Sequence, residues 1–356
     1  MRTKTLFALL GSLFYSVLPA QQSAAFGAPK FAPADGQKLL IIGQDLSAVG
    51  GLDTYQDGYY DHFPELPSPD PHRETLSSQG SRISASLRPA GVTTYTSIPS
   101  LAGLNSAANW GAGTVNAQAY LDNDRFRHSC LSIGLYLVGQ LKKIGRGKHD
   151  DAIIRLAEWI KQSQRPVFLR IGYEFEGEWN DYQPKHFIKA WQRIVQIFDQ
   201  QKVDNVAYVW QSAGINLPNI EDWYPGDEYV NWVGYSHFDG PNPGQRMRAF
   251  AEDHDKPIMI AEATPKVDLK EVDGTSCWEQ WFAPLFELIY QNDRIKALAY
   301  ISTYWDQQPM WAGQGWGDSR LHINEPIRQA WTQEMQKPYW LAGGEQLFQL
   351  LGYQSD

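Results

Sequence analysis

The fold that the sequence predicts is a single (β/α)₈ barrel, and three observations support it. Eight short runs rich in β-branched and aromatic residues recur along the chain, each bounded by Gly, Pro, Asn or Asp. Most of these runs are continuously apolar, which is typical of parallel strands buried on both faces. Between several of them the apolar period changes to about 3.6 residues, as in amphipathic helices that cover a sheet.

The predicted elements follow in chain order. Strands are expected at 38–45, 91–98, 131–137, 166–175, 206–212, 230–238, 257–263 and 295–305. Amphipathic helices are expected at 150–162 and 186–200, and two more helical segments, at 326–336 and 345–351, would complete the outer ring. Cys130 opens the third strand and Cys277 follows the seventh, so the ring places them too far apart for a disulfide. We therefore expect two free thiols.

Residues 1–25 have the pattern of a secretory signal peptide. Arg2 and Lys4 precede an apolar run from Leu6 to Leu18, and small residues follow it. This run is shorter than the ~20 residues that a membrane-spanning helix needs, and no later stretch is long and apolar enough. We expect one barrel domain over 26–356, secreted or periplasmic, and a monomer.

Composition narrows the possible partners. Of the 356 residues, 43% are hydrophobic and 20% are charged, which is compatible with a large core and excludes disorder. The formal net charge of −9 opposes phosphate backbones and anionic lipids, so neither a nucleic acid nor a membrane is an expected partner. No spacing of Cys or His is typical of a zinc or haem site, so we expect no metal and no cofactor.

Carboxylates stand where a barrel gathers its chemistry, at the C-terminal ends of the strands. The fourth strand ends in a segment that contains Glu174 and Glu176, which alternation places on the same face as Arg170 if the strand stays regular. The seventh strand is apolar until Glu262 appears at its end. Burying a charge costs several kcal/mol unless it is paired, so Glu262 predicts either a functional group or a structural ion pair with an arginine.

Two carboxylates at one barrel mouth are suited to cleavage of a glycosidic bond, with one acid to protonate the leaving oxygen and one carboxylate to attack or to activate water. The motif Arg-x-x-x-Glu-x-x-Gly-x-Trp, from Arg170 to Trp179, and the Ala-Glu pair at Glu262 together resemble glycoside hydrolase family 26 of clan A. The resemblance extends from about Leu39 to Trp331. It implies retaining hydrolysis of β-mannans, β-1,3-xylans or mixed-linkage glucans, with Glu174 as acid/base and Glu262 as nucleophile.

The resemblance also implies substrate-binding residues. Trp179 follows the acid/base in the position of a substrate-binding tryptophan, and Trp210 and Trp305 occupy sugar-stacking positions, although a place in the barrel core is the alternative for both. A Gly-rich loop with Trp311 and Trp316 follows the eighth strand, and the loop after the first strand, Asp53 to Tyr60 and Pro64 to Pro71, would form another rim of the site.

Several positions depart from the family pattern. Tyr173 and Glu176 stand where the family usually has His and Asn, and Phe238 stands where a Tyr would bond the nucleophile. Tyr235 or His237 could replace that Tyr if the sixth strand bulges. The usual Trp-His pair after the third strand is absent, with the sequence Val-Gly-Gln at 138–140. These changes leave the sugar open, and they also allow Tyr173, Glu176, Tyr235 and His237 to contact substrate.

Two other functions share these features. A transglycosylase would use both glutamates and differ only in how well water is excluded from the second step. A non-catalytic carbohydrate-binding barrel would keep the cleft, but it gains little from two desolvated carboxylates. The sequence therefore predicts a hydrolase of a β-linked polysaccharide or oligosaccharide, endo-acting rather than exo-acting.

Overall fold

The computed structural model describes residues 28–63, 75–76, 82–83, 88–240 and 242–354. The predicted signal peptide, and the part of the first loop at 64–71, lie outside the described residues. Within those residues, the model contains no helix whose length and apolar character would let it span a bilayer.

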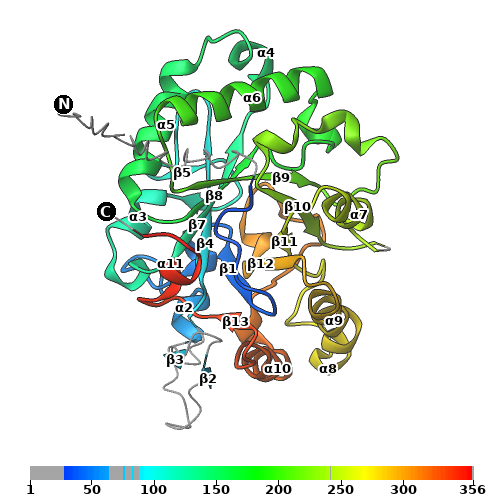
Figure 1. Cartoon of the computed structure of the whole chain (residues 1–356). Helices are drawn as coiled ribbons and strands as arrows, with labels where there is room; N and C mark the ends of the chain where they lie inside the picture. Colours follow the sequence, from blue (N-terminus) through cyan, green and yellow to red (C-terminus); the bar gives the residue numbers. More distant parts are fainter. Residues whose placement is uncertain (1–27, 64–74, 77–81, 84–87, 241, 355–356) are drawn as a thin grey trace, which may run out of the picture.

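Eight parallel strands close into a barrel (Figure 1), which confirms the predicted fold. In ring order they are β1 (Lys38–Gly43), β4 (Gly91–Ser97), β7 (Cys130–Tyr136), β8 (Val167–Ile171), β9 (Val206–Ser212), β10 (Trp232–His237), β11 (Ile258–Ala263) and β12 (Ile295–Ile301), and β12 pairs with β1. All eight predicted strands are present. The short strand β13 (Trp340–Leu341) adds beside the start of β1.

Helices surround the strands, as Figure 1 shows for α5, α6, α7, α9 and α10. The helices are α1 (Leu46–Val49), α2 (Tyr59–His62), α3 (Ala117–Leu121), α4 (Leu141–Ile144), α5 (Asp150–Ser163), α6 (Pro184–Gln200), α7 (Gln245–Asp253), α8 (Gly274–Cys277), α9 (Ala283–Gln291), α10 (Glu325–Met335) and α11 (Leu347–Leu350). The predicted helices correspond to α5, α6, α10 and α11. Two small hairpins pair β2 (Thr75–Leu76) with β3 (Arg82–Ile83), and β5 (Ala108–Asn109) with β6 (Thr114–Val115).

Strand alternation divides the apolar side chains into two layers. The larger cluster lies between the strands and the helices, and includes Leu131 and Leu169. The smaller cluster fills the barrel with Ile41, Phe168 and Trp232, and residues from both ends of the chain join it. Because the interior below the mouth is filled, ligands can reach only the loops at the strand ends. Cys130 and Cys277 are both free thiols, as predicted.

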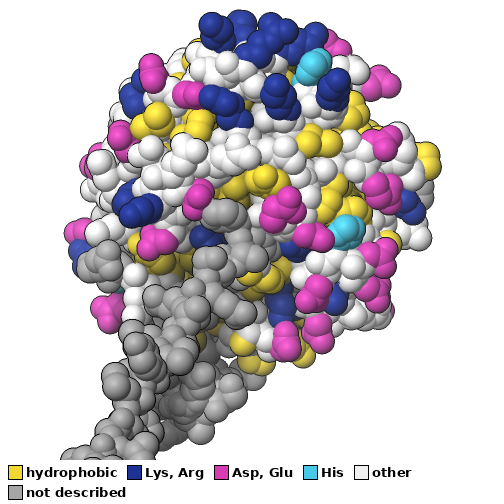
Figure 2. Space-filling view, turned by 45° about the horizontal axis from the view of Figure 1, so that its top comes forward, with side chains coloured by type: hydrophobic (Ala, Val, Ile, Leu, Met, Phe, Trp, Pro, Cys, Tyr) yellow, Lys and Arg dark blue, Asp and Glu magenta, His cyan; other side chains and the backbone are white. Residues whose placement is uncertain are grey.

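The surface charge is unevenly distributed. Figure 2 shows acidic side chains over much of one face, while Lys and Arg gather along its upper edge, where α4 and α6 lie in Figure 1. Exposed Lys142 and Lys143 of α4 belong to that edge.

Trp331 of α10 holds the helical layer to the barrel. It is fully buried, it packs against Tyr300 of β12 and Phe286 of α9, and its indole Nε1 donates to the Tyr59 hydroxyl at 3.0 Å. We expect Trp331→Ala to lower the free energy of unfolding by about 3–5 kcal/mol, because truncation leaves a cavity and an unpaired Tyr59 hydroxyl. Urea titration measures this. Trp179→Ala, at a side chain that is 62% exposed, should change stability by less than about 0.5 kcal/mol; equal losses would contradict the assignment.

Candidate active site

A β-bulge aims Glu262 into the barrel. On the β10 side, Tyr235 pairs with Ile260 and the next residue, Ser236, pairs with Glu262, so Ala261 is an extra residue in β11. Ala261 packs in the inner cluster, and regular alternation would turn the residue after it toward the helices. The bulge instead lets Glu262 face inward as well. Bulges of this kind re-aim side chains next to active sites.

Inside the barrel mouth, two side chains bind the Glu262 carboxylate. Arg170 of β8 donates from Nη1 to Oε1 at 2.6 Å, and the Tyr95 hydroxyl of β4 donates to the same oxygen at 3.0 Å. Glu262 is 7% exposed and the Arg170 side chain is fully buried. Their ion pair offsets the cost of burying both charges and keeps a carboxylate at the mouth of the barrel. The sequence-based alternative of an arginine partner is therefore correct, but that arginine belongs to the same site.

Glu174 is presented by a turn, which corrects the expectation of a regular strand to residue 175. Strand β8 ends at Ile171, and both Gly172 and Glu174 have φ of +53°. This left-handed conformation is rare for residues other than glycine, and it is often found at functional sites. Asn180 stabilises the turn by donating from Nδ2 to the Glu174 carbonyl oxygen at 2.8 Å.

A hydrogen-bonded network links the two glutamates. From Arg170, Nη1 also donates to Gln211 Oε1 at 2.9 Å, and Gln211 Nε2 donates to Ser236 Oγ at 3.1 Å. Ser236 Oγ donates to Glu174 Oε1 at 2.7 Å. The network crosses from β8 through β9 and β10, so three adjacent strands fix the positions of both carboxylates. Both glutamates therefore belong to one site.

The two glutamates differ in their electrostatic environments. Burial raises the pKa of Glu174, and the negative charge of Glu262 raises it further, whereas the hydrogen bond from Ser236 opposes the shift. Glu174 therefore holds its proton to a higher pH than an ordinary glutamate. Glu262, by contrast, is bound to a guanidinium. A neutral acid beside a paired carboxylate is the arrangement that acid-assisted nucleophilic attack requires.

Glu176 is a third carboxylate near this pair. Ser212 Oγ and the backbone N–H of Ala213 both donate to it, the latter at 3.0 Å. Burial raises the pKa of Glu176, and the hydrogen bond from Ser212 opposes that shift. Its charge in turn contributes to the raised pKa of Glu174, after burial and Glu262. Glu176 is thus a partly buried residue of the site and not a solvated loop residue.

Two of the other predicted residues lie where ligand could reach them. Tyr173 is partly buried, with its ring edge against Tyr95 and over the Arg170 guanidinium. Trp179 is 62% exposed in the loop after β8. Both remain candidates for contacting substrate.

Three other predictions are corrected by side-chain burial. Trp210 and Tyr235 point outward from β9 and β10 into the layer beneath the helices, where Trp210 stacks on Phe175, so neither can contact a sugar. Trp305 is 2% exposed, with Nε1 bonded to Ser319 Oγ at 3.0 Å and with Trp316 packed against its ring. Strand parity decides the first two positions, and the Gly-rich loop covers the third.

His237 lies at the end of β10, with its ring against Trp281. Burial lowers its pKa to about 4, and the nearby Arg248 lowers it too. The partner of Glu174 from this strand is Ser236 instead, and the hydroxyl that bonds Glu262 comes from Tyr95 on β4. The expected replacement of the family tyrosine by Tyr235 or His237 is therefore wrong, although β10 and β11 do shift register here.

The sequence-based reasoning did not identify Tyr95, Gln211 and Ser236. Each is a polar side chain near the C-terminal end of a strand that is otherwise largely buried, which is the signal that could have found them. Their polarity alone gives no partner, because the network exists only once β4, β8, β9, β10 and β11 are placed side by side.

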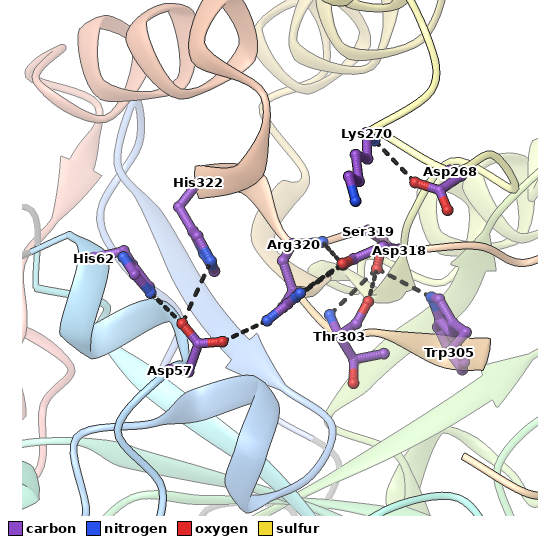
Figure 3. A network of polar contacts seen from close by, with 10 residues as sticks. All are labelled: Asp57, His62, Asp268, Lys270, Thr303, Trp305, Asp318, Ser319, Arg320 and His322. Carbon is purple, nitrogen blue, oxygen red and sulfur yellow. Dashed lines mark hydrogen bonds and ion pairs between the residues drawn. The ribbon is translucent and has the colours of Figure 1, made fainter. Parts of the chain in front are cut away.

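Within the described residues, one group of side chains brings possible metal ligands together. Asp57, His62 and His322 place one ligand atom each within 4.8 Å of one another. Figure 3 shows Asp57 bonded to His62 on one side and Arg320 on the other. The two imidazoles stack in parallel, with 3.5 Å between ring centroids, so their in-plane lone pairs run side by side instead of converging on one ion. We assign the group as an ion-pair clamp.

Comparison with known proteins agrees with this geometry. Residues 142–308 match the sequence model of glycosyl hydrolase family 26. The chain is 32% identical over 301 residues to a β-1,3-xylanase of an Alcaligenes species, covering 76% of this chain and 64% of that protein. It is also 32% identical over 295 residues to the β-1,3-xylanase TXYA of a Vibrio species, covering 74% and 64%. The chain thus spans 64% of the length of each of these relatives.

Solved structures share the fold at lower identity. A family 26 β-mannanase from Bacteroides ovatus superposes with a TM-score of 0.58 at 13% identity, covering 90% of this chain and 93% of that one. The protein GH26C of a Muricauda species gives a TM-score of 0.59 at 16% identity, covering 90% and 91%.

The charge of Glu176 should be measurable in the pH profile of the reaction. We expect Glu176→Gln to move the alkaline limb of kcat/KM to lower pH, because loss of a like charge lowers the pKa of Glu174. The pH dependence of kcat/KM on a soluble substrate measures this. Glu178→Gln, at an exposed carboxylate two residues further along, is the control and should leave the limb in place. A limb that moves to higher pH in Glu176→Gln would contradict the assignment.

Proposed function

Because the chain resembles glycosyl hydrolase family 26, we propose that it is an endo-acting retaining hydrolase of β-linked polysaccharides. The observation that supports this most directly is the pair of glutamates at one barrel mouth in opposite electrostatic states. Glu262 is bound to Arg170, and Glu174 has a raised pKa. Retaining cleavage needs a nucleophilic carboxylate and a protonated acid in one site.

In the first step, Glu262 attacks the anomeric carbon and forms a covalent glycosyl-enzyme, while Glu174 gives its proton to the departing oxygen. Arg170 and Tyr95 orient the attacking carboxylate by binding Oε1, which leaves Oε2 to react. As the ester forms, the negative charge of Glu262 disappears. The pKa of Glu174 then falls, because one of the charges that raised it is gone.

In the second step, Glu174 acts as a base. It is now deprotonated, and it takes a proton from the water that attacks the anomeric carbon, which restores free Glu262. Ser236 supports this step because its hydroxyl donates to Glu174 and so favours the carboxylate form. The same contacts thus serve both protonation states.

Among β-linked polysaccharides, we propose β-1,3-xylan as the first candidate substrate. Two relatives of 32% identity are named β-1,3-xylanases, whereas the β-mannanase from Bacteroides ovatus shares 13% identity. A non-catalytic carbohydrate-binding function is less compatible with the site, because it gives no reason for a buried ion pair beside a carboxyl group of raised pKa.

We also propose that the protein is exported. The proposal is supported by the residues at 1–25, where two positive charges precede an apolar run that ends in small residues. A polymer substrate too large to enter a cell is consistent with such an address.

Substitution of the two glutamates should separate their roles. We expect Glu262→Gln to abolish release of reducing ends from every substrate, because no nucleophile remains. Glu174→Gln should slow polysaccharide cleavage by roughly 10²–10⁴-fold. With an aryl glycoside whose phenolate leaves without a proton, Glu174→Gln should still release a burst of phenolate. Wild-type activity in Glu262→Gln would refute the assignment.

The stereochemistry of the product tests the mechanism independently. Proton NMR of a freshly started digest of β-1,3-xylan should show the β-anomer of the new reducing end first, because two displacements retain configuration. An initial α-anomer would indicate single displacement. Digests of β-mannan and of mixed-linkage glucan, run beside Glu262→Gln as a blank, identify the preferred polymer by reducing ends released.

A further inference from the structure

A polar cavity of about 370 Å³ lies apart from the two glutamates. It opens between the loop that follows β1 and the loop that follows β12, and the β5–β6 hairpin also contributes to its wall. Neither Glu174 nor Glu262 lines it. In the ring of strands, β12 lies next to β11, which carries Glu262, and across the barrel from β8. The cavity and the glutamates share the C-terminal face of the barrel.

Ion pairs hold the two loops together and fix the shape of the cavity. Asp57 of the first loop pairs with Arg320 after β12 at 2.6 Å, and Asp318 holds the other side of that guanidinium at 2.7 Å. His62 and His322 stack beside them, as Figure 3 shows. The clamp described above therefore joins the first and eighth loops. Arg320 and Asp57 also cancel one another's charge at the cavity wall.

Buried hydrogen bonds fix the base of the cavity. Gln308 Nε2 donates to Asp45 Oδ2 at 3.1 Å and to Thr303 Oγ1 at 2.9 Å, while Gln308 Oε1 accepts from Gln44 Nε2 at 3.3 Å. These contacts join the ends of β1 and β12 below the loops. A cavity with a base and walls already bonded can bind ligand without the cost of ordering its own groups.

Several polar groups on the wall have no partner within the described part of the chain. They are the side-chain amide of Gln307 and the hydroxyls of Tyr55 and Tyr304. Gln307 is exposed, and both tyrosine rings are partly exposed. Flat rings beside free amide and hydroxyl groups match a sugar, which offers an apolar face and a rim of hydroxyls.

Exposed apolar side chains continue this wall toward the solvent. Trp110 is 48% exposed and Met310 is 45% exposed. The two loops that carry them are joined, because the Met310 N–H donates to the Gly111 carbonyl at 2.8 Å. Asn109 and Pro309, which line the cavity, directly precede them. An exposed tryptophan beside a polar cavity is a surface on which the next sugar of a chain could stack.

We propose that this cavity is a saccharide-binding subsite, which holds a neutral sugar of the polysaccharide at a distance from the bond that is cleaved. The balanced charges of Asp57 and Arg320 favour a neutral sugar over an acidic one. This inference rests on the proposed function, and it adds that substrate length, and not only the sugar at the reacting glutamates, determines how well a substrate is cleaved.

The test compares long and short substrates in two cavity variants. Gln307→Ala removes an exposed side chain without hydrogen bonds, so it should fold normally, and Tyr55→Ala removes a ring of the wall. We expect each to lower kcat/KM for a β-1,3-linked xylohexaose by about threefold to tenfold, and to leave kcat/KM for the xylobiose unchanged. Gln349→Ala, at an exposed glutamine outside the cavity, is the matched control and should change neither value.

Calorimetry separates failure of the subsite from failure of the proposed function. In the Glu262→Gln background, the hexaose should bind more weakly by the same factor when Gln307→Ala or Tyr55→Ala is added, and this measurement needs no turnover. Unchanged hexaose affinity in both cavity variants, or an equal loss for xylobiose, would overturn the subsite even if wild type cleaves xylan. If wild type cleaves nothing but the cavity variants lose hexaose affinity, the subsite stands and the hydrolase proposal fails.

Discussion

The buried ion pair between Arg170 and Glu262 is the constraint on which the site depends. A guanidinium with no exposed surface must be paired, because an isolated charge in the interior costs several kcal/mol. In this barrel its partners are the Glu262 carboxylate and the Gln211 amide, and both hydrogen bonds come from Nη1. The position of Arg170 thus sets the position of Glu262 directly. Through Gln211 and Ser236 it also sets the position of Glu174.

Two departures from regular geometry make this arrangement possible. The extra residue Ala261 in β11 turns Glu262 inward, and the left-handed turn after Ile171 takes Glu174 out of the β8 strand. Each departure costs conformational energy, and each is held by neighbouring hydrogen bonds, such as those from Asn180 to the turn. The rigid barrel below supplies the support, since its interior is filled by Phe168, Trp232 and their neighbours.

Asymmetry around the barrel mouth connects the chemistry to recognition. The glutamates lie on β8 and β11, whereas the first and eighth loops meet at the ends of β1 and β12, where Asp57 and Arg320 join them. Aromatic side chains divide in the same way. Trp210 and Trp331 stabilise the helical layer, and only those displayed by loops, such as Trp179 and Trp110, present a face to solvent. A count of tryptophans therefore says little about sugar binding until their burial is known.

The sequence by itself determined the barrel, the order of its strands and both glutamates, because hydrophobic period and strand-end position are local properties of the chain. It also determined that Cys130 and Cys277 stay apart. Only the tertiary structure decided which way each side chain faces and what it touches. Trp210 and Tyr235 face outward, Trp305 is covered, and Ser236 and Tyr95 reach the glutamates. The reason is that a bulge shifts parity by one residue, and that each hydrogen bond of the network joins strands far apart in the chain.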